Sequence, residues 1–288
     1  MFAMKIALIG ADGQLGSDLL RTLRDERLTP LYYPDFDITR PAETRSVLNG
    51  LRPDVVINTA AFHRVDDCED LVEEAFRVNA FAVRDLARIC RDLEATLVHF
   101  STDYVFDGRS SRPYVEEDPP QPLSAYGASK LAGEYFVRAV CEKYFLVRTC
   151  GLFGLAGCLG KGRNFVETML FYAEAGRPLR VVNDQWVTPT SCEELAARLA
   201  ELIRTDRYGL YHMTNEGRCT WFEFASAIFD LLGRPAKITA VDSASFGAKA
   251  RRPAFSVLEN KRAKALGLAN FSEWREALRD YLRKRGLI

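Results

Sequence analysis

The stretch IALIGADGQLGSDLL, residues 6–20, decides the fold class of this chain. It opens with four aliphatic residues, Ile6 to Ile9, as in a strand that is buried on both faces of a parallel sheet. From Leu15 onward, leucines recur at the spacing of a helix. Three evenly spaced glycines, Gly10, Gly13 and Gly16, mark the junction. The stretch therefore predicts a strand, a glycine-rich turn and the start of a helix.

This turn is a candidate anion site. The first N–H groups of a helix and the positive end of its dipole point at the same spot. Glycine is needed where a β-carbon would keep a diphosphate away from the backbone. The spacing is GxxGxxG, whereas the best-known dinucleotide fingerprint is GxGxxG, so a glycine-rich turn without a ligand remains an alternative interpretation.

Composition narrows the class of protein. The 288 residues suit one large α/β domain, or a nucleotide-binding domain with a smaller lobe. The 39 basic and 39 acidic residues predict neither a nucleic-acid nor a membrane partner. No stretch approaches the roughly 20 apolar residues of a membrane span. Seven scattered cysteines without a CxxC pair indicate reduced thiols in the cytoplasm, and with three histidines we expect no metal site.

Strand and helix patterns alternate along the first half of the chain. After the first strand, candidate strands cover 28–33, 54–58, 96–101 and 145–149, and helical patterns cover roughly 42–51, 71–93 and 125–141. This alternation predicts an α/β fold with a Rossmann-type doubly wound parallel sheet over residues 1–150. For residues 151–288 we expect a smaller α/β lobe that binds substrate, with a partial return of the chain to the sheet. Helices are predicted near 164–175 and 272–285.

The candidate catalytic residues are Tyr126, Lys130 and Thr102. Residues four apart on a helix share a face, so the phenol of Tyr126 and the amine of Lys130 stand side by side. A free tyrosine has a pKa of about 10, and a neighbouring lysine cation favours the phenolate. Tyr-x-x-x-Lys alone is common on surface helices. Thr102 adds a hydroxyl at the carboxyl end of a predicted strand, the edge at which the glycine turn lies and at which ligands bind in such sheets.

In this order, the glycine turn, Thr102, Tyr126 and Lys130 resemble the extended short-chain dehydrogenase/reductase superfamily. The chain is most similar to the dTDP-4-dehydrorhamnose reductase family. The stretches that carry the resemblance include STDYVFDG (101–108), PLSAYGASKLAGE (122–134), NDQWVTPTS (183–191) and RRPAF (251–255). They span most of the chain in the family's order.

The resemblance implies reduction of the 4-keto group of a nucleotide-linked deoxysugar by NADPH or NADH, first of all dTDP-4-dehydro-L-rhamnose to dTDP-L-rhamnose. Tyr126 would donate the proton, beside Lys130 and Thr102. The residues implied in cofactor binding are Gly10, Gly13, Gln14, Leu15, Gly16, Asp37, Ile38, Ala60, Ala61, Phe62, Tyr126 and Lys130. Those implied in binding the sugar nucleotide are Thr102, Asp103, Tyr104, Asn164 and Arg252, with Arg252 placed to bind the diphosphate. The resemblance leaves the oligomeric state open, with a homodimer as one option.

Several of these residues have alternative interpretations. Asp37 could instead cap the helix that begins near Pro41, and Asp103 could hold its loop through backbone N–H groups. The acidic residues of 66–70 predict a charged helix start rather than a metal site. RRPAF could be a solvated turn. Gly151 stands where the family commonly has a tryptophan, so an aromatic wall near the sugar is either missing or comes from Phe153 or Trp186.

Cofactor preference and activity also have alternatives. Tyr32 and Tyr33 stand where an acid often binds the ribose 2′-hydroxyl, which favours NADPH slightly over NADH. An epimerase or dehydratase of the same fold is a second interpretation, and Asp103 beside Thr102 keeps the dehydratase open. A non-catalytic subunit resembling the regulatory β-subunit of methionine adenosyltransferase is a third.

Overall fold

The computed structural model describes residues 3–157, 162–268 and 270–288. Its centre is a six-stranded sheet in the order β10-β5-β4-β3-β1-β2, in which every pair of neighbours is parallel. The strands are β1 (Lys5–Ile9), β2 (Arg27–Leu31), β3 (Val55–Asn58), β4 (Thr96–Thr102), β5 (Tyr144–Thr149) and β10 (Gly209–His212). The predicted doubly wound parallel sheet is confirmed, with strand ends displaced by one or two residues.

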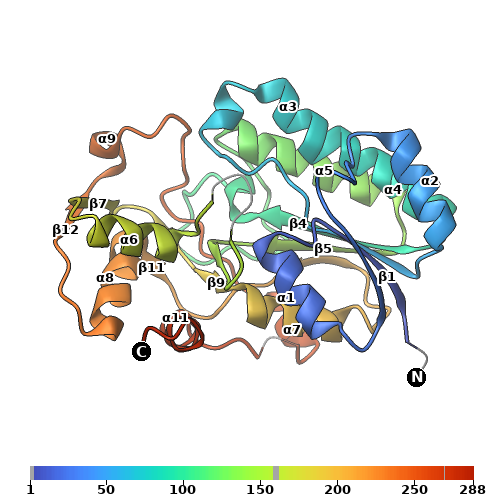
Figure 1. Cartoon of the computed structure of the whole chain (residues 1–288). Coiled ribbons are helices and arrows are strands. Elements are labelled where there is room, and N and C mark those ends of the chain that lie inside the picture. The colour runs from blue at the N-terminus through green and yellow to red at the C-terminus, as the bar shows by residue number, and fades with distance from the viewer. Residues whose placement is uncertain (1–2, 158–161, 269) are drawn as a thin grey trace.

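Helices cover both faces of this sheet, as Figure 1 shows. On one face lie α1 (Gln14–Thr22), α7 (Cys192–Leu202) and α10 (Lys261–Ala265), and on the other α2 (Pro41–Leu51), α4 (Ala82–Asp92) and α5 (Ala125–Val140). Successive β1 residues serve opposite faces: Ile6 and Leu8 pack in the core under α1, whereas Ala7 and Ile9 pack in the core under α4. A strand covered on both faces has to be apolar throughout, which explains the run that opens the sequence.

The helical pattern over 71–93 forms three successive segments. They are α3 (Val72–Phe76), a π-helical segment (Arg77–Phe81) and α4. Periodicity predicted one helix and did not reveal the wider turn in its middle. Such π-bulges occur mostly as single turns inside helices and are frequent at functional sites. This turn contains Asn79, whose buried side chain forms two hydrogen bonds with the backbone of Phe62, in the loop that follows β3.

The second lobe is built from short strand pairs and helices around its own apolar core. β6 (Leu152–Phe153) pairs with β9 (Thr190–Ser191), β7 (Leu179–Val182) with β12 (Ile238–Val241), and β8 (Trp186–Val187) with β11 (Cys219–Thr220). Its helices are α6 (Phe165–Glu174), α8 (Trp221–Leu232), α9 (Ser243–Phe246) and α11 (Trp274–Lys284). Between these elements the chain returns to the central sheet with α7 and β10. Figure 1 shows the lobe beside the carboxyl ends of the sheet strands.

Two short 3₁₀ turns lie at Asp67–Glu69 and Asp103–Val105. Within the described residues, no helix has the length and apolar character that a membrane crossing requires.

Candidate functional site

The glycine turn that joins β1 to α1 is tightly packed. Gly10 has a φ of +73°, and a β-carbon there would lie 2.6 Å from the Thr59 hydroxyl. A β-carbon on Gly16 would lie 2.2 Å from the carbonyl oxygen of Gly10. Gly13 is the N-cap residue of α1, and no described side chain caps this helix. The first N–H groups of α1 are therefore open to an anion, in a cradle that a β-carbon would fill.

We expect Gly16→Ala to destabilise the protein by about 1–3 kcal/mol, because the new methyl group meets backbone that cannot move away. Denaturant unfolding measures the loss. Gly50→Ala in α2 is the matched control, since a β-carbon at Gly50 meets nothing within 4 Å. The control should be neutral or more stable by up to about 1 kcal/mol. Equal stability of the two variants would contradict the close packing at Gly16.

The topological switch point lies between β1 and β3, because β2 and β3 flank β1 on opposite sides. The Thr59 hydroxyl lies 2.8 Å from the carbonyl oxygen of Ile9 and ties the two strand ends together. The loop that follows, Ala60 to Phe62, is held by two amide side chains. Ala60 N–H donates to Asn58 (3.1 Å), and Phe62 exchanges two hydrogen bonds with Asn79 (2.9 Å each). The three residues predicted beneath the cofactor thus lie at the switch point.

Thr102 and Tyr126 are brought together at the carboxyl end of β4. Ser124 caps α5 by accepting from Gly127 N–H (3.2 Å), and a β-carbon on Gly127 would lie 2.3 Å from the carbonyl oxygen of Tyr104. The helix start therefore sits directly on the loop that follows Thr102. The Thr102 side chain lies close enough to Tyr126 to affect its phenol. Burial raises the pKa of the Tyr126 phenol above its ordinary value, and the Thr102 side chain opposes this in part, so the phenol holds its proton in the free protein.

Asp103 determines how Thr102 uses its single proton. The Thr102 hydroxyl donates to Asp103 Oδ1 (3.0 Å), and its oxygen accepts from Tyr104 N–H (3.2 Å). Asp103 Oδ2 accepts from the Cys150 thiol (3.1 Å) and the Ser256 hydroxyl (2.6 Å). The anchoring donors are thus side chains and not the backbone N–H groups of the alternative interpretation. Burial raises the pKa of Asp103, against the lowering effect of these donors.

Arg252 reaches the same region from the second lobe and is already paired. Its guanidinium binds Asp66 with two hydrogen bonds (3.0 and 2.8 Å), and the bond to Arg252 lowers the pKa of Asp66. Lys249 pairs with Asp70 nearby. Arg252 also interacts electrostatically with Tyr104, whose ring meets the Tyr126 ring edge-on at 5.9 Å. RRPAF is therefore a structured contact with the sheet domain and not a solvated turn.

Lys130 is buried, one helical turn beyond Tyr126. Burial lowers its pKa to about 8, and the carboxylate of Glu134 opposes the shift. The amine lies 3.4 Å from Nε2 of His99, a fully buried ring on β4. Neither His99 nor the two amides Asn58 and Asn79 was singled out from the sequence. The available signal was a polar residue inside an apolar run, as in VHFS (98–101).

In the structure, Asn164 and Asp37 both form hydrogen bonds with other groups of the protein. Asn164 caps α6 and donates to Gly154 O (3.1 Å) and the Tyr281 phenol (3.2 Å), so its role toward substrate remains a prediction. Asp37 accepts from Thr39 N–H (2.8 Å), and the N-cap of α2 is Arg40. The capping alternative for Asp37 is therefore wrong. Gln14 reaches across to Gly154 N–H (3.1 Å) and links the glycine turn to the second lobe.

The position of Gly151 is covered by Trp221. Gly151 has a φ of +53°, and a β-carbon there would lie 3.2 Å from Cη2 of the Trp221 ring. Phe153 is only 1% exposed and packs in the core of the second lobe, so the expectation that it supplies the aromatic wall is wrong. Trp221 is only partly buried, and its ring is the group that a β-carbon at this position would meet first.

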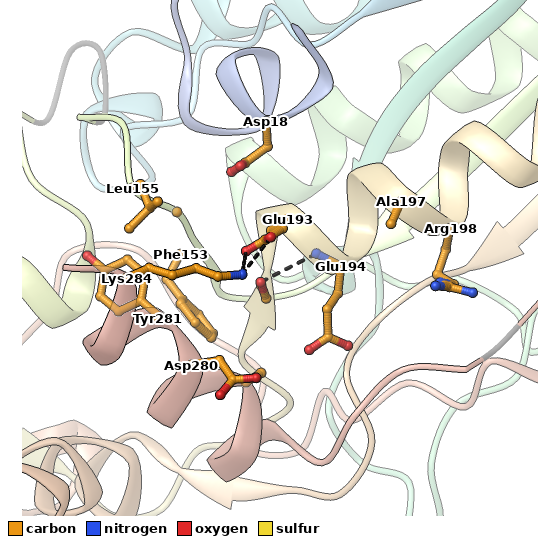
Figure 2. Close-up of a pocket in the computed structure, with 13 residues that line it drawn as sticks. Asp18, Phe153, Leu155, Glu193, Glu194, Ala197, Arg198, Asp280, Tyr281 and Lys284 are labelled. Carbon is orange, nitrogen blue, oxygen red and sulfur yellow. Dashed lines mark hydrogen bonds and ion pairs between the residues drawn. The ribbon is translucent and has the colours of Figure 1, made fainter. Parts of the chain in front are cut away.

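A separate pocket of about 190 Å³ lies between α1, α7 and α11 (Figure 2). Lys284 crosses it to bind Glu193 (2.6 Å), and Asp18 faces it from α1. None of the predicted cofactor or substrate residues lines this pocket. In the described part of the chain, no group of three or more His, Cys, Asp or Glu side chains is arranged to hold a metal ion.

The structure combines a glycine turn after β1 with a threonine at the end of β4 and with a tyrosine and a lysine one turn apart on α5. This combination defines the class of extended short-chain dehydrogenases/reductases. Comparison with known proteins names the family within it. The model of the RmlD substrate binding domain matches residues 4–286. The chain belongs to this family, that of the dTDP-4-dehydrorhamnose reductases.

Three relatives illustrate the similarity. The spore coat polysaccharide biosynthesis protein SpsK of Bacillus subtilis is 38% identical, with 98% of each chain covered. The dTDP-4-dehydrorhamnose reductase of Burkholderia thailandensis is 36% identical, with 96% of this chain and 97% of the relative covered. The crystal structure of the Bacillus anthracis dTDP-4-dehydrorhamnose reductase with NADP has a TM-score of 0.94 at 35% identity and covers 98% of this chain and 100% of its own.

Proposed function

We propose that this protein reduces the 4-keto group of a dTDP-linked 6-deoxysugar, first of all dTDP-4-dehydro-L-rhamnose, with NADPH or NADH. The observation that carries the proposal is the placement of a protonated Tyr126 next to Thr102 at the carboxyl end of β4, on the sheet edge that carries the open glycine turn. The names of the relatives support the substrate class. An assay that follows oxidation of the reduced cofactor with a panel of 4-keto sugar nucleotides tests it. Absence of turnover with every substrate would favour the non-catalytic subunit.

The protein's own groups account for the proton that this reduction consumes. When bound, the nicotinamide supplies the hydride for the carbonyl carbon. Tyr126 donates its phenolic proton to the carbonyl oxygen as that oxygen gains negative charge. Thr102 lies beside this phenol, and its own proton is committed to Asp103. The glycine cradle and the N-terminus of α1 would hold the cofactor diphosphate, and Lys130 would hold the ribose.

Tyr126→Phe should lower kcat by about 10²- to 10⁴-fold, the usual range for a positioned acid, with little change in cofactor affinity. Phenylalanine keeps the ring contact with Tyr104 and removes only the proton donor. Steady-state kinetics and cofactor titration check both parts. Lys130→Met should instead impair turnover and cofactor binding together. Near-wild-type turnover of Tyr126→Phe would remove this phenol from the mechanism.

We propose that the protein binds NADPH more tightly than NADH, or binds the two cofactors equally well. β2 ends at Leu31, and the two residues that follow, Tyr32 and Tyr33, are exposed and carry no charge that could repel a 2′-phosphate. We expect fluorescence titration to give an NADPH dissociation constant no higher than that for NADH. NADH binding more than about tenfold tighter would contradict this and would indicate that an acid such as Asp35 reaches the ribose.

Arg252 is proposed to bind the substrate diphosphate. Arg252→Ala removes a charge-assisted contact worth about 1.5–3 kcal/mol, so the substrate KM should rise roughly 10- to 150-fold while the cofactor Kd stays constant. Arg252→Lys should recover only part of the loss, because an ammonium group cannot make the paired contact.

Arg251 is the matched control, since it is exposed and adjacent in sequence. Its alanine variant should be close to wild type. A larger effect at Arg251 than at Arg252 would mean that the alignment to the family is wrong by one residue. No effect at either position would exclude this segment from substrate binding.

We propose that the protein is located in the cytoplasm. The buried free thiols of Cys90, Cys141, Cys150 and Cys219 support this compartment.

A homodimer remains a prediction that sedimentation analysis can test.

A further inference from the structure

Three buried polar side chains stand in a row behind the predicted active site: Asn58 on β3, His99 on β4 and Lys130 on α5. Asn58 and His99 are 0% exposed and are direct neighbours in the register of β3 and β4. Asn58 Nδ2 lies 3.2 Å from His99 Nδ1, and His99 Nε2 lies 3.4 Å from Lys130 Nζ. The row thus connects the end of β3 to the lysine.

The backbone of the cofactor loop fixes the orientation of Asn58. Its Oδ1 accepts from the N–H of Ala60 at 3.1 Å, so the amide nitrogen faces His99. An amide nitrogen can only donate, which makes His99 Nδ1 an acceptor without a proton. A neutral imidazole with a bare Nδ1 carries its proton on Nε2. The ring is therefore held in the Nε2–H tautomer.

That proton points at Lys130. An ammonium group has three donors and no acceptor, so it cannot face an N–H at hydrogen-bond distance without repulsion. A neutral amine has a lone pair and can accept from Nε2–H. The ring is 0% exposed, so water cannot take the place of Lys130 as the partner of this proton. The hydrogen-bond pattern thus favours the amine form of Lys130.

We propose that Asn58 and His99 are positioning residues that hold Lys130 as a neutral amine in the free protein, so that it takes up a proton only when other acceptors replace His99. This inference rests on the proposed function, because it assigns a purpose to the protonation state of Lys130. When Lys130 leaves His99, its amine takes up a proton from solvent, and the ammonium group so formed stabilises the phenolate that Tyr126 becomes after it has given its proton to the substrate.

The charges around Lys130 are few. Glu134 lies one helical turn further along α5 and favours the ammonium form, but its carboxylate is bound by both nitrogens of the buried Arg148 (2.8 and 2.7 Å). Tyr126, one turn earlier, is a neutral phenol. Burial lowers the pKa of Lys130 to about 8, and a fixed donor facing Nζ lowers it further. Burial holds the pKa of His99 well below its ordinary value, and a charge on Lys130 would lower it further, so the ring stays neutral whichever form Lys130 takes.

Nitrogen NMR of protein labelled with ¹⁵N-histidine tests the tautomer without substrate. The chain has only three histidines, and the His99→Gln variant identifies the ring by the loss of its signals. We expect a bare Nδ1 and a protonated Nε2 at His99, unchanged between about pH 6 and about pH 9. A proton on Nδ1, or a ring that titrates in this interval, would overturn the proposal. Because no turnover is measured, the result is independent of whether the protein reduces a 4-keto sugar.

Asn58→Asp tests the consequence for Lys130. A carboxylate oxygen opposite Nδ1 draws the ring proton to Nδ1 and leaves Nε2 to accept from an ammonium group. The ring signals should change to the other tautomer, and the pKa of Lys130, followed through its Cε resonance, should rise by at least about one pH unit. An unchanged tautomer together with an unchanged Lys130 titration would reject the proposed coupling.

Asn79→Asp is the matched control. Asn79 is also 0% exposed and binds the same loop, and it contacts α5 through Ser129 (3.0 Å), but it makes no hydrogen bond to His99. The same chemical change there should leave the His99 tautomer as in wild type. If Asn58→Asp does not fold, the tautomer of the wild-type protein still decides the proposal.

Discussion

The buried carboxylate of Asp103 is the interaction on which the geometry of this site depends. It accepts from Thr102 at the end of β4, from Cys150 just after β5 and from Ser256 in the second lobe. A buried carboxylate without donors would cost several kcal/mol, so three segments distant in sequence are drawn to one point. One of these bonds commits the proton of Thr102 to Asp103, beside Tyr126. Asp103 therefore links the assembly of the two lobes to the hydroxyl next to the phenol that we propose as the proton donor.

Part of the candidate site could be predicted from the sequence, because the sequence signals for these residues are local. The glycine turn follows from three glycines between an apolar strand and an amphipathic helix, and each of Gly10 and Gly16 meets an atom that excludes a β-carbon. Tyr126 and Lys130 follow from helical spacing. Thr102 follows from its place directly after an apolar run, because carboxyl ends of parallel strands share one edge of the sheet.

Other parts depend on register and could not be predicted from spacing. Asn58 and His99 each look like the polar end of a strand, and only the pairing of β3 with β4 brings them into contact. Asn79 was hidden inside a helical pattern, because one wide turn hardly alters the periodicity of apolar residues. Phe153 was misjudged as an aromatic wall because its burial depends on contacts with α8 and α11, far along the chain. Local patterns say nothing about such contacts.

The pair of Arg252 and Asp66 adds an energetic constraint on substrate binding. In the free protein the guanidinium is largely covered, and both of its bonds to Asp66 are formed. A diphosphate that binds Arg252 must share the guanidinium with this carboxylate or displace it, and either arrangement brings like charges together. Net affinity is then the difference between the new contact and the loss or crowding of the old one. Because Arg252 also interacts with Tyr104, whose ring contacts that of Tyr126, a change of partner at Arg252 alters the surroundings of the phenol that we propose as the proton donor.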